Sequence, residues 1–197
     1  MLNSDDISFY LTRFKGLSIT DAIGLFKLAQ TKRLAAGDIY IHQNSNYQKV
    51  AYIKKGLIRM YQLKPSGDEV TLMLRWENKF IASHDSIILQ QPSRFIYQAL
   101  EDTVLMEIDY RKAQPLMENT PKLSALRNEF LLAMLAESMH RVESFIMFSP
   151  EERYLQLVRE KPDIVNRVPD KYLATLLGIT PVSLSRIRKR IATPVRR

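Results

Sequence analysis

The sequence predicts an α+β protein in which an antiparallel β-structure, a long helix and a helix-turn-helix follow one another along the chain. Short runs of β-branched and aromatic residues alternate with turn signals between residues 39 and 108. A long stretch without a helix breaker follows them. Near the end of the sequence, a glycine separates two short amphipathic segments, which is typical of two helices joined by a tight turn.

The composition is that of an ordinary globular protein, with 46% apolar and 25% charged residues among 197. Cysteine is absent, which excludes disulfides and cysteine-ligated metal centres. The sequence does not start with a basic segment and an apolar run, and its apolar stretches are short. We therefore expect neither a secretory signal nor a membrane span, and we expect a cytoplasmic protein.

The net charge of +8 is unevenly distributed. Residues 151–197 contain 11 Lys and Arg against 5 Asp and Glu, whereas residues 1–150 contain 18 against 16. Such an excess at one end is typical of a module that binds a polyanion. A solvated basic surface would give the same composition, so charge alone leaves both interpretations open.

The first part of the chain is predicted to combine helices with short strands. Apolar residues at helical spacing predict helices over residues 1–30, with Ser18 or Thr20 as a cap of the second one. Strands are predicted at residues 39–41, 50–53, 57–61, 70–74, 95–100 and 104–108. Turn signals such as Gly37-Asp38 and Lys55-Gly56 separate these runs. Many short strands at this spacing predict an antiparallel sandwich or barrel.

A long helix is predicted between Pro121 and Pro150. Its apolar residues recur at steps of three and four, and they are Leu123, Leu126, Phe130, Met134, Leu135, Met139, Val142, Phe145 and Ile146. Such a helix is roughly 40 Å long, which exceeds what one small barrel can cover. We therefore predict a seam against the same helix of a second subunit, with a long core helix as the alternative.

A new helix is predicted to begin where the long one ends. Ser149, Pro150 and Glu152 have the spacing of a capping box with proline in the first turn, and Pro162 sets the end of this helix. The predicted domains are therefore residues 1–120, residues 121–148 and an all-helical tail, residues 149–197.

Residues 168–191 give the strongest signal in the sequence. Gly178 supplies the left-handed residue that ends a first helix, Thr180 caps a second helix, and Pro181 occupies its first turn. The apolar residues of both helices are predicted to face inward: Leu173, Ala174, Leu176, Leu177, Leu184, Ile187 and Ile191. This pattern is typical of a helix-turn-helix, with a basic αα-hairpin as the alternative.

The outer face of the second predicted helix, residues 181–191, is polar and basic. Its predicted contacts to duplex DNA are Thr180, Ser183, Ser185, Arg186, Arg188, Lys189 and Arg190. Short polar side chains can approach base edges, and arginine can donate two hydrogen bonds to guanine. Arg186 is the predicted base contact, whereas Arg188, Lys189 and Arg190 are predicted to contact phosphates.

The order of β-structure, long helix and helix-turn-helix resembles the catabolite-activator (Crp/Fnr) family of bacterial regulators over nearly the whole chain. The resemblance rests on Gly37-Asp38, residues 55–59, the long helix and residues 176–187. It implies an N-terminal antiparallel β-roll, the jelly roll of cyclic-nucleotide-binding domains. It also implies a homodimer on a near-palindromic site with half-sites about 34 Å apart, and RNA polymerase as a partner. Residues 90–95 and 151–155 resemble the branch common in Bacteroidetes-type bacteria.

The sequence departs from the residues that hold a cyclic nucleotide in members of that family. Ala82-Ser83 stands at their glycine-glutamate pair, and Ser93-Arg94 stands one residue out of register at their arginine-serine pair. We therefore predict no cofactor, with a cyclic nucleotide as the alternative. The resemblance implies that an effector in the roll would be lined by Ser83, Arg94, Tyr97 and Ser138, and a filled roll without effector is equally compatible.

The DNA-binding end departs from that family as well. Pro181 and Val182 stand where better-known members carry polar base-contacting residues, so we predict a different operator. Few residues follow Ile191, so we predict that the β-wing is absent and that residues 193–197 form a basic arm near phosphates.

Other classes of protein remain as alternatives. His42, His84 and His140 are far apart in sequence, so we predict no metal site and no enzyme of the cupin class, which shares a β-barrel. The competing hypothesis is a ligand-binding β-roll module whose basic helical tail binds protein or RNA.

Overall fold

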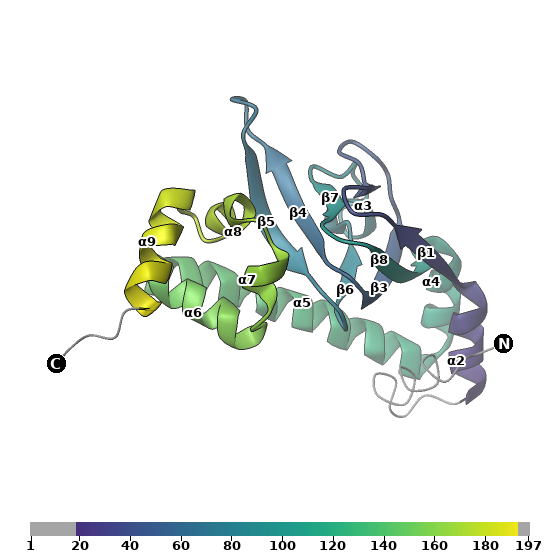
Figure 1. Cartoon of the computed structure of the whole chain (residues 1–197). Helices are drawn as coiled ribbons and strands as arrows, with labels where there is room; N and C mark the ends of the chain where they lie inside the picture. Colours follow the sequence, from purple (N-terminus) through teal and green to yellow (C-terminus); the bar gives the residue numbers. More distant parts are fainter. Residues whose placement is uncertain (1–18, 193–197) are drawn as a thin grey trace.

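The computed structural model describes residues 19–192, which form a β-roll, one long helix and a small helical unit (Figure 1). Two four-stranded antiparallel sheets make the roll, in the orders β1-β8-β3-β6 and β2-β7-β4-β5. The strands are β1 (Ala29–Leu34), β2 (Ile39–Ile41), β3 (Lys49–Lys55), β4 (Ile58–Leu63), β5 (Glu69–Arg75), β6 (Phe80–Ala82), β7 (Ile96–Ala99) and β8 (Thr103–Asp109). Ile41, Ile53 and Leu105 are fully buried between the sheets. The predicted antiparallel β-roll is therefore confirmed.

The helices lie along one side of the roll and at its ends (Figure 1). They are α2 (Ile19–Leu28), α3 (His84–Ile87), α4 (Tyr110–Asn119), α5 (Pro121–Met147), α6 (Pro150–Glu160), α7 (Ile164–Arg167), α8 (Asp170–Leu176) and α9 (Pro181–Ala192). The predicted capping box at the start of α6 is present, because Ser149 and Glu152 each accept a hydrogen bond from the other's backbone N–H group. Helices α3, α4 and α7 were not predicted from the sequence. Two of them are only four residues long, and α4 contains Pro115.

The helical prediction for residues 1–30 is wrong at its end. Residues 29 and 30 belong to β1, which pairs with β8 at the edge of its sheet. Residues 30–33 are all exposed, so the strand lacks the alternation of apolar and polar residues by which strands are recognised. The predicted helical residues 1–18 lie outside the described part of the chain.

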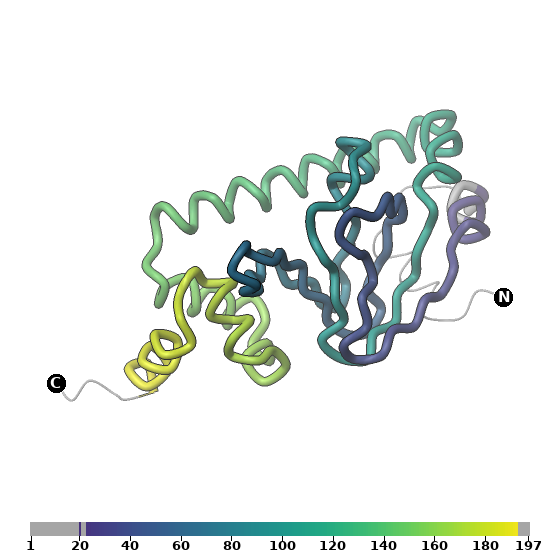
Figure 2. The backbone as a smooth tube through the Cα atoms, turned by 90° about the horizontal axis from the view of Figure 1, so that it is seen from above, coloured from purple at the N-terminus to yellow at the C-terminus, as the bar shows by residue number. Residues whose placement is uncertain are grey.

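Helix α5 passes along one side of the roll (Figure 2). Its apolar residues lie on two different faces of the helix. Leu123 is fully buried, and the Phe130 ring packs edge-on against Phe80 of β6 with ring centroids 5.1 Å apart. A second row is exposed, with Leu132, Leu135, Met139, Val142 and Ile146 each more than half exposed. The single stripe predicted from the sequence is therefore two stripes, and only one of them contacts the roll.

The helical unit packs against the end of the β4–β5 hairpin, with α8 beside β5 (Figures 1 and 2). Leu57 and Leu74 of the roll are buried in the same apolar cluster as Ile164, Leu173 and Leu184 of the helical unit. Burial of these side chains joins the two parts into one body, since apolar area removed from water stabilises a contact roughly in proportion to its size.

Polar contacts add to this junction. The Arg59 guanidinium is buried between the rings of Tyr61 and Tyr172, 3.9 and 3.6 Å from their centroids. The Thr71 N–H of β5 donates a hydrogen bond to Thr175 Oγ1 of α8, at 3.1 Å. Because α8 precedes the turn to α9, these contacts also fix where α9 points.

Arg167 forms the ionic part of the same junction. Its guanidinium contacts Glu77 and Glu101 of the roll, with N–O distances of 2.6 and 2.5 Å. Burial alone would raise the pKa of the Glu77 carboxyl, but hydrogen bonds from Arg167 and from the Gly56 N–H lower that pKa to about 2. Glu77 is therefore ionised at neutral pH and holds α7 against the roll.

Candidate nucleic-acid interface

The turn between α8 and α9 has the geometry predicted from the sequence. Gly178 adopts a φ of +71°, a left-handed conformation in which residues other than glycine are strained. A β-carbon there would lie 3.0 Å from the Phe145 ring, so close packing adds a second reason for glycine. Thr180 Oγ1 accepts a hydrogen bond from the Ser183 N–H at 3.2 Å and thereby caps α9.

The inward face of the two helices follows the prediction with one exception. Leu173, Ala174, Leu176, Leu177, Leu184 and Ile187 are buried, as predicted. The prediction for Ile191 is wrong, because this side chain is 40% exposed. It lies in the last turn of α9, where the core beneath the helix has ended.

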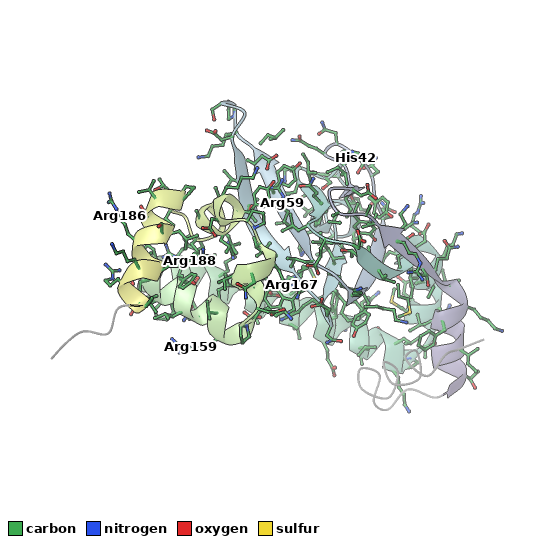
Figure 3. All side chains as sticks on the ribbon, in the orientation of Figure 1. His42, Arg59, Arg159, Arg167, Arg186 and Arg188 are labelled. Atoms are coloured by element: carbon green, nitrogen blue, oxygen red, sulfur yellow. The ribbon has the colours of Figure 1, made fainter. Side chains whose placement is uncertain are left out.

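Arg186 is the cation of α9 that the rest of the protein leaves available. Its side chain is exposed and points away from the molecule at the outer side of the helix (Figure 3). It forms no hydrogen bond or ion pair with any of residues 19–192. Ser185 and Lys189 are exposed beside it, whereas Ser183 is half-buried and its hydroxyl lies 3.1 Å from Thr180 Oγ1.

Arg188 and Arg190 are engaged within the protein. Arg188 Nη1 donates to Asp170 Oδ1 at 2.6 Å, and its guanidinium lies over the Tyr154 ring at 5.8 Å from the centroid. Arg190 forms an ion pair with Glu151 at the start of α6. Arg188 therefore ties α9 to α8 and α6, and only Arg190 is exposed enough to exchange its partner for a phosphate. The predicted DNA contacts of these residues stay predictions.

The structure brings the side-chain hydroxyl groups of Ser83 and Tyr97 together, but it does not gather all four predicted effector residues into one cavity. Ser83 is fully buried and caps α3 by accepting a hydrogen bond from the Ser86 N–H. Tyr97 is buried, with its hydroxyl donating to the Ala82 carbonyl at 3.2 Å. Ser138 is exposed on α5 and donates to the Met134 carbonyl within its own helix. Ser83, Tyr97 and Ser138 line three different cavities, and Arg94 lines none of the three.

The guanidinium of Arg94 already holds a carboxylate. Asp85 is buried and accepts hydrogen bonds from Arg94 Nε, Nη2 and backbone N–H, at 3.1, 2.9 and 2.9 Å. Burial would raise the pKa of Asp85, but these bonds outweigh burial and lower that pKa below its ordinary value. The residues present therefore do not fit a cyclic nucleotide, since its phosphate would have to displace an ionised side chain. The role of Asp85 could not be predicted from the sequence, because no local pattern pairs residue 85 with residue 94.

Neither a metal site nor a membrane segment is found in the part of the chain that the structure describes. No group of histidine, aspartate and glutamate side chains within residues 19–192 is arranged to hold a metal ion. Over the same residues, no helix combines the length and the apolar character needed to cross a bilayer.

The fold and the geometry define a class of protein in which a jelly roll carries a helix-turn-helix. Comparison with known proteins agrees with this assignment of the fold. Residues 31–120 match the family model described as the cyclic nucleotide-binding domain. No curated protein sequence matches the chain.

Solved structures with this fold include several bacterial regulators. The catabolite activator protein of Thermus thermophilus is 19% identical, with a TM-score of 0.56 over 91% of this chain and 85% of that one. FixK2 of Bradyrhizobium japonicum is 12% identical, with a TM-score of 0.72 over 83% and 84%. A protein of Eubacterium rectale described as a transcriptional regulator of the Crp/Fnr family is 18% identical, with a TM-score of 0.70 over 93% and 87%. The chain therefore has the fold of Crp/Fnr regulators, and these structural neighbours are regulators rather than enzymes.

Proposed function

We propose that this protein is a transcriptional regulator of the Crp/Fnr type that binds duplex DNA through α9. The observation that carries the proposal is Arg186, an exposed guanidinium without a partner in the described residues, on the outer face of a helix positioned by a helix-turn-helix turn. Desolvating such a group is favourable only when it meets an acceptor, and guanine offers two acceptors in the major groove.

Homodimerisation through α5 is part of the proposal. The exposed apolar residues of this helix follow steps of three and four, and they are Leu132, Leu135, Met139, Val142 and Ile146. This is the a and d pattern of a coiled coil, and it runs along the face that does not contact the roll. A partner α5 on this seam would place two copies of α9 on one side of the dimer, as a palindromic operator requires.

The resemblance to the Bacteroidetes-type branch, an operator with half-sites about 34 Å apart, and RNA polymerase as partner belong to the same proposal. Such a regulator acts in the cytoplasm, where the chromosome is. The roll serves as the scaffold that holds the helix-turn-helix, because the Thr71–Thr175 hydrogen bond links it to α8 and the Arg167 ion pairs link it to α7, which precedes α8.

Selection of bound sequences from random duplexes tests the proposal. We expect a near-palindromic consensus, and an affinity that falls steeply with salt because phosphate contacts release counterions. Single-stranded RNA of the same length and a flexible polyanion are the controls. Equal binding to these controls would contradict the proposal and would favour the alternative in which the basic helical unit binds RNA or protein.

A light-scattering measurement tests the seam separately. Wild type should be a dimer at micromolar concentration, and Leu135→Glu should be a monomer, because a charge at a d position leaves a carboxylate buried without a partner. Leu63→Glu is a matched control, since Leu63 is an exposed leucine on the roll, and it should leave the dimer intact. A monomeric wild type would remove the seam from the proposal.

A further inference from the structure

A cavity of about 550 Å³ lies where the roll, the long helix and the helical unit meet. Trp76 and Arg75 at the end of β5, Glu137, Arg141 and Phe145 of α5, and Arg153 of α6 form part of its wall. Its size is that of sites for small organic ligands, which range from about 300 to 1,000 Å³. We call it the junction cavity.

The charges on the wall of the junction cavity do not balance. Arg75 is neutralised by Glu137, with two N–O contacts of 2.5 and 3.0 Å. Arg153 donates to the carbonyl oxygens of Phe148 and Leu177, at 2.5 and 2.9 Å. Neither Arg153 nor Arg141 forms an ion pair with a carboxylate of residues 19–192.

Arg141 is the less engaged of these two cations. It donates one hydrogen bond, from Nη2 to the Leu176 carbonyl at 3.1 Å, and a guanidinium carries five N–H donors. Its pKa is lowered by burial and by the neighbouring positive charges of Arg75 and Arg153. The remaining acid on the wall, Glu160, is paired with Lys79 at 3.3 Å. Glu137 also acts on Arg141 and partly offsets the repulsion, but this carboxylate is already paired with Arg75. An anion in the cavity would therefore relieve the repulsion that remains among the three arginines.

The other wall residues suit an apolar body attached to that anion. Trp76 and Phe145 contribute aromatic rings, and Met73 and Met134 contribute flexible apolar side chains. One part of each ring is already covered by a cation, since Arg153 lies 4.3 Å from the Phe145 centroid and Lys79 lies 5.4 Å from that of Trp76. His84 also lines the cavity. Its burial and, to a smaller extent, the positive charge of Arg75 lower its pKa, so His84 adds no positive charge at neutral pH.

We propose that the junction cavity binds a small organic anion, with its carboxylate, sulfonate or phosphate group on Arg141 and its aromatic or apolar part between Trp76 and Phe145. The site lies outside the interior of the roll, because the roll contributes only residues 73–76 and His84 to its wall. A ligand held there contacts the roll, α5 and the helical unit at once.

A carboxylate from a partner subunit is the competing occupant, and the helix geometry argues against it. Val142 and Ile146 of the seam also line the cavity, so a partner α5 would border it. In the pattern of the seam, however, Met139 and Val142 stand at core positions, so Arg141 falls at a position that turns away from a partner α5. Its hydrogen bond to Leu176 is consistent with this, since Leu176 belongs to the same subunit.

Anilinonaphthalene sulfonate, an aromatic anion, is the probe for the test, and phenylnaphthylamine is its neutral analogue. We expect the full-length protein to bind the sulfonate more tightly than the amine. Arg141→Gln keeps a donor for the Leu176 carbonyl but removes the charge, so it should weaken sulfonate binding about tenfold and leave amine binding unchanged. Arg141→Lys should retain most of the sulfonate affinity.

Arg127→Gln is the matched control. Arg127 lines a different cavity of about 560 Å³, mostly apolar, which is enclosed by the roll, α3, α4 and α5. This variant should bind both probes as wild type does. Equal affinity of wild type for the two probes, an unchanged Arg141→Gln, or an equal loss in Arg127→Gln would each overturn the proposal.

Quenching of Trp76, the single tryptophan of the chain, gives a second measurement. Iodide should quench its fluorescence more strongly in wild type than in Arg141→Gln, whereas acrylamide, which is neutral, should quench both alike. A shared fall for both quenchers would mean a change of fold rather than of charge and would count against the proposal. Weaker self-association of Arg141→Gln in light scattering would assign the cation to a partner subunit instead.

Discussion

Two arginines, Arg94 in the roll and Arg186 in α9, show how the same side chain serves different purposes in this protein. Both are well exposed. Arg94 nevertheless holds the buried carboxylate of Asp85 through three hydrogen bonds, whereas Arg186 has no partner among residues 19–192. Exposure alone therefore does not identify a guanidinium that can bind an external anion.

The difference lies in what the neighbouring backbone provides. The loop from residue 85 to residue 94 closes on itself, because the Gln91 N–H also donates to the Asp85 carbonyl, at 2.9 Å. The contact between Arg94 and Asp85 therefore closes this loop, and the charge of Arg94 is already paired within it. Arg186 stands on a helix whose inward face supplies all the packing, so its side chain contributes nothing to the fold.

The largest expected effect is on stability and distinguishes the two arginine sites directly. Asp85→Ala removes a buried acceptor of three hydrogen bonds and should lower the free energy of unfolding by about 3 kcal/mol. Arg186→Ala should change it by less than about 0.5 kcal/mol. Denaturant unfolding of both variants checks this, and equal losses would contradict the comparison.

Arg167 is a third kind of arginine, because its guanidinium is shared by two carboxylates, those of Glu77 and Glu101. The pKa of Glu77 is about 2 in the folded protein against 4.5 ordinarily, so its ion pair stabilises the fold above pH 4.5. Glu77→Gln should lower the free energy of unfolding by about 2 kcal/mol at pH 7. The difference from wild type should shrink as the pH falls from about 4.5 towards 2, since protonation removes the same charge.

Unfolding curves across this pH range measure that difference. Asp85 and Glu152, whose pKa values are also lowered, share no partner with Glu77 and should titrate alike in both proteins. Asp163 shares Arg167 and Lys161 with Glu77, so its titration belongs to the same difference. A difference that does not depend on pH would mean that Glu77 acts by packing and not by charge.

The next effect is on DNA affinity, and it tests whether the unpaired Arg186 contacts a base. Arg186→Ala should reduce the preference at one base pair of each half-site by about 1–3 kcal/mol. Arg190→Ala, on the same helix, should instead weaken all sequences alike and lower the salt slope by about 1. Titrations of a consensus duplex and its single-base variants check both. Uniform weakening by Arg186→Ala would make that residue a phosphate contact.

The smallest effect concerns the exposed pair between Arg190 and Glu151. Arg190→Gln should change the free energy of unfolding by less than about 1 kcal/mol, and added salt should reduce even that, because the guanidinium is mostly solvated. Thermal unfolding at low and high salt checks this. A larger loss would place Arg190 with Arg94 as a structural arginine.

The helix-turn-helix could be predicted from the sequence because its signals are local. Gly178, Thr180 and Pro181 each have a physical reason within a few residues of chain, and the structure confirms the turn and the cap. The error at Ile191 arose because periodicity continues past the point where the core beneath the helix ends.

The features that could not be predicted from the sequence depend on contacts between residues far apart in the chain. Strand β1 exists because β8 lies beside it, although its own residues show no strand pattern. The division of α5 into a roll-facing stripe and an exposed stripe depends on where Phe80 and the rest of the roll lie. The pairing of Asp85 with Arg94 and the burial of Arg59 between two tyrosines likewise depend on the folded chain.

The stacking of Arg59 between Tyr61 and Tyr172 has a consequence for the operator in the proposed function. It attaches the helix-turn-helix to a sheet, which is stiffer than the single linker between α5 and α6. In the proposed dimer, the spacing of the two recognition helices then depends on the roll as much as on the coiled coil of α5. Each base pair inserted between half-sites turns one of them by about 34° around the duplex, and a stiff attachment cannot follow that rotation.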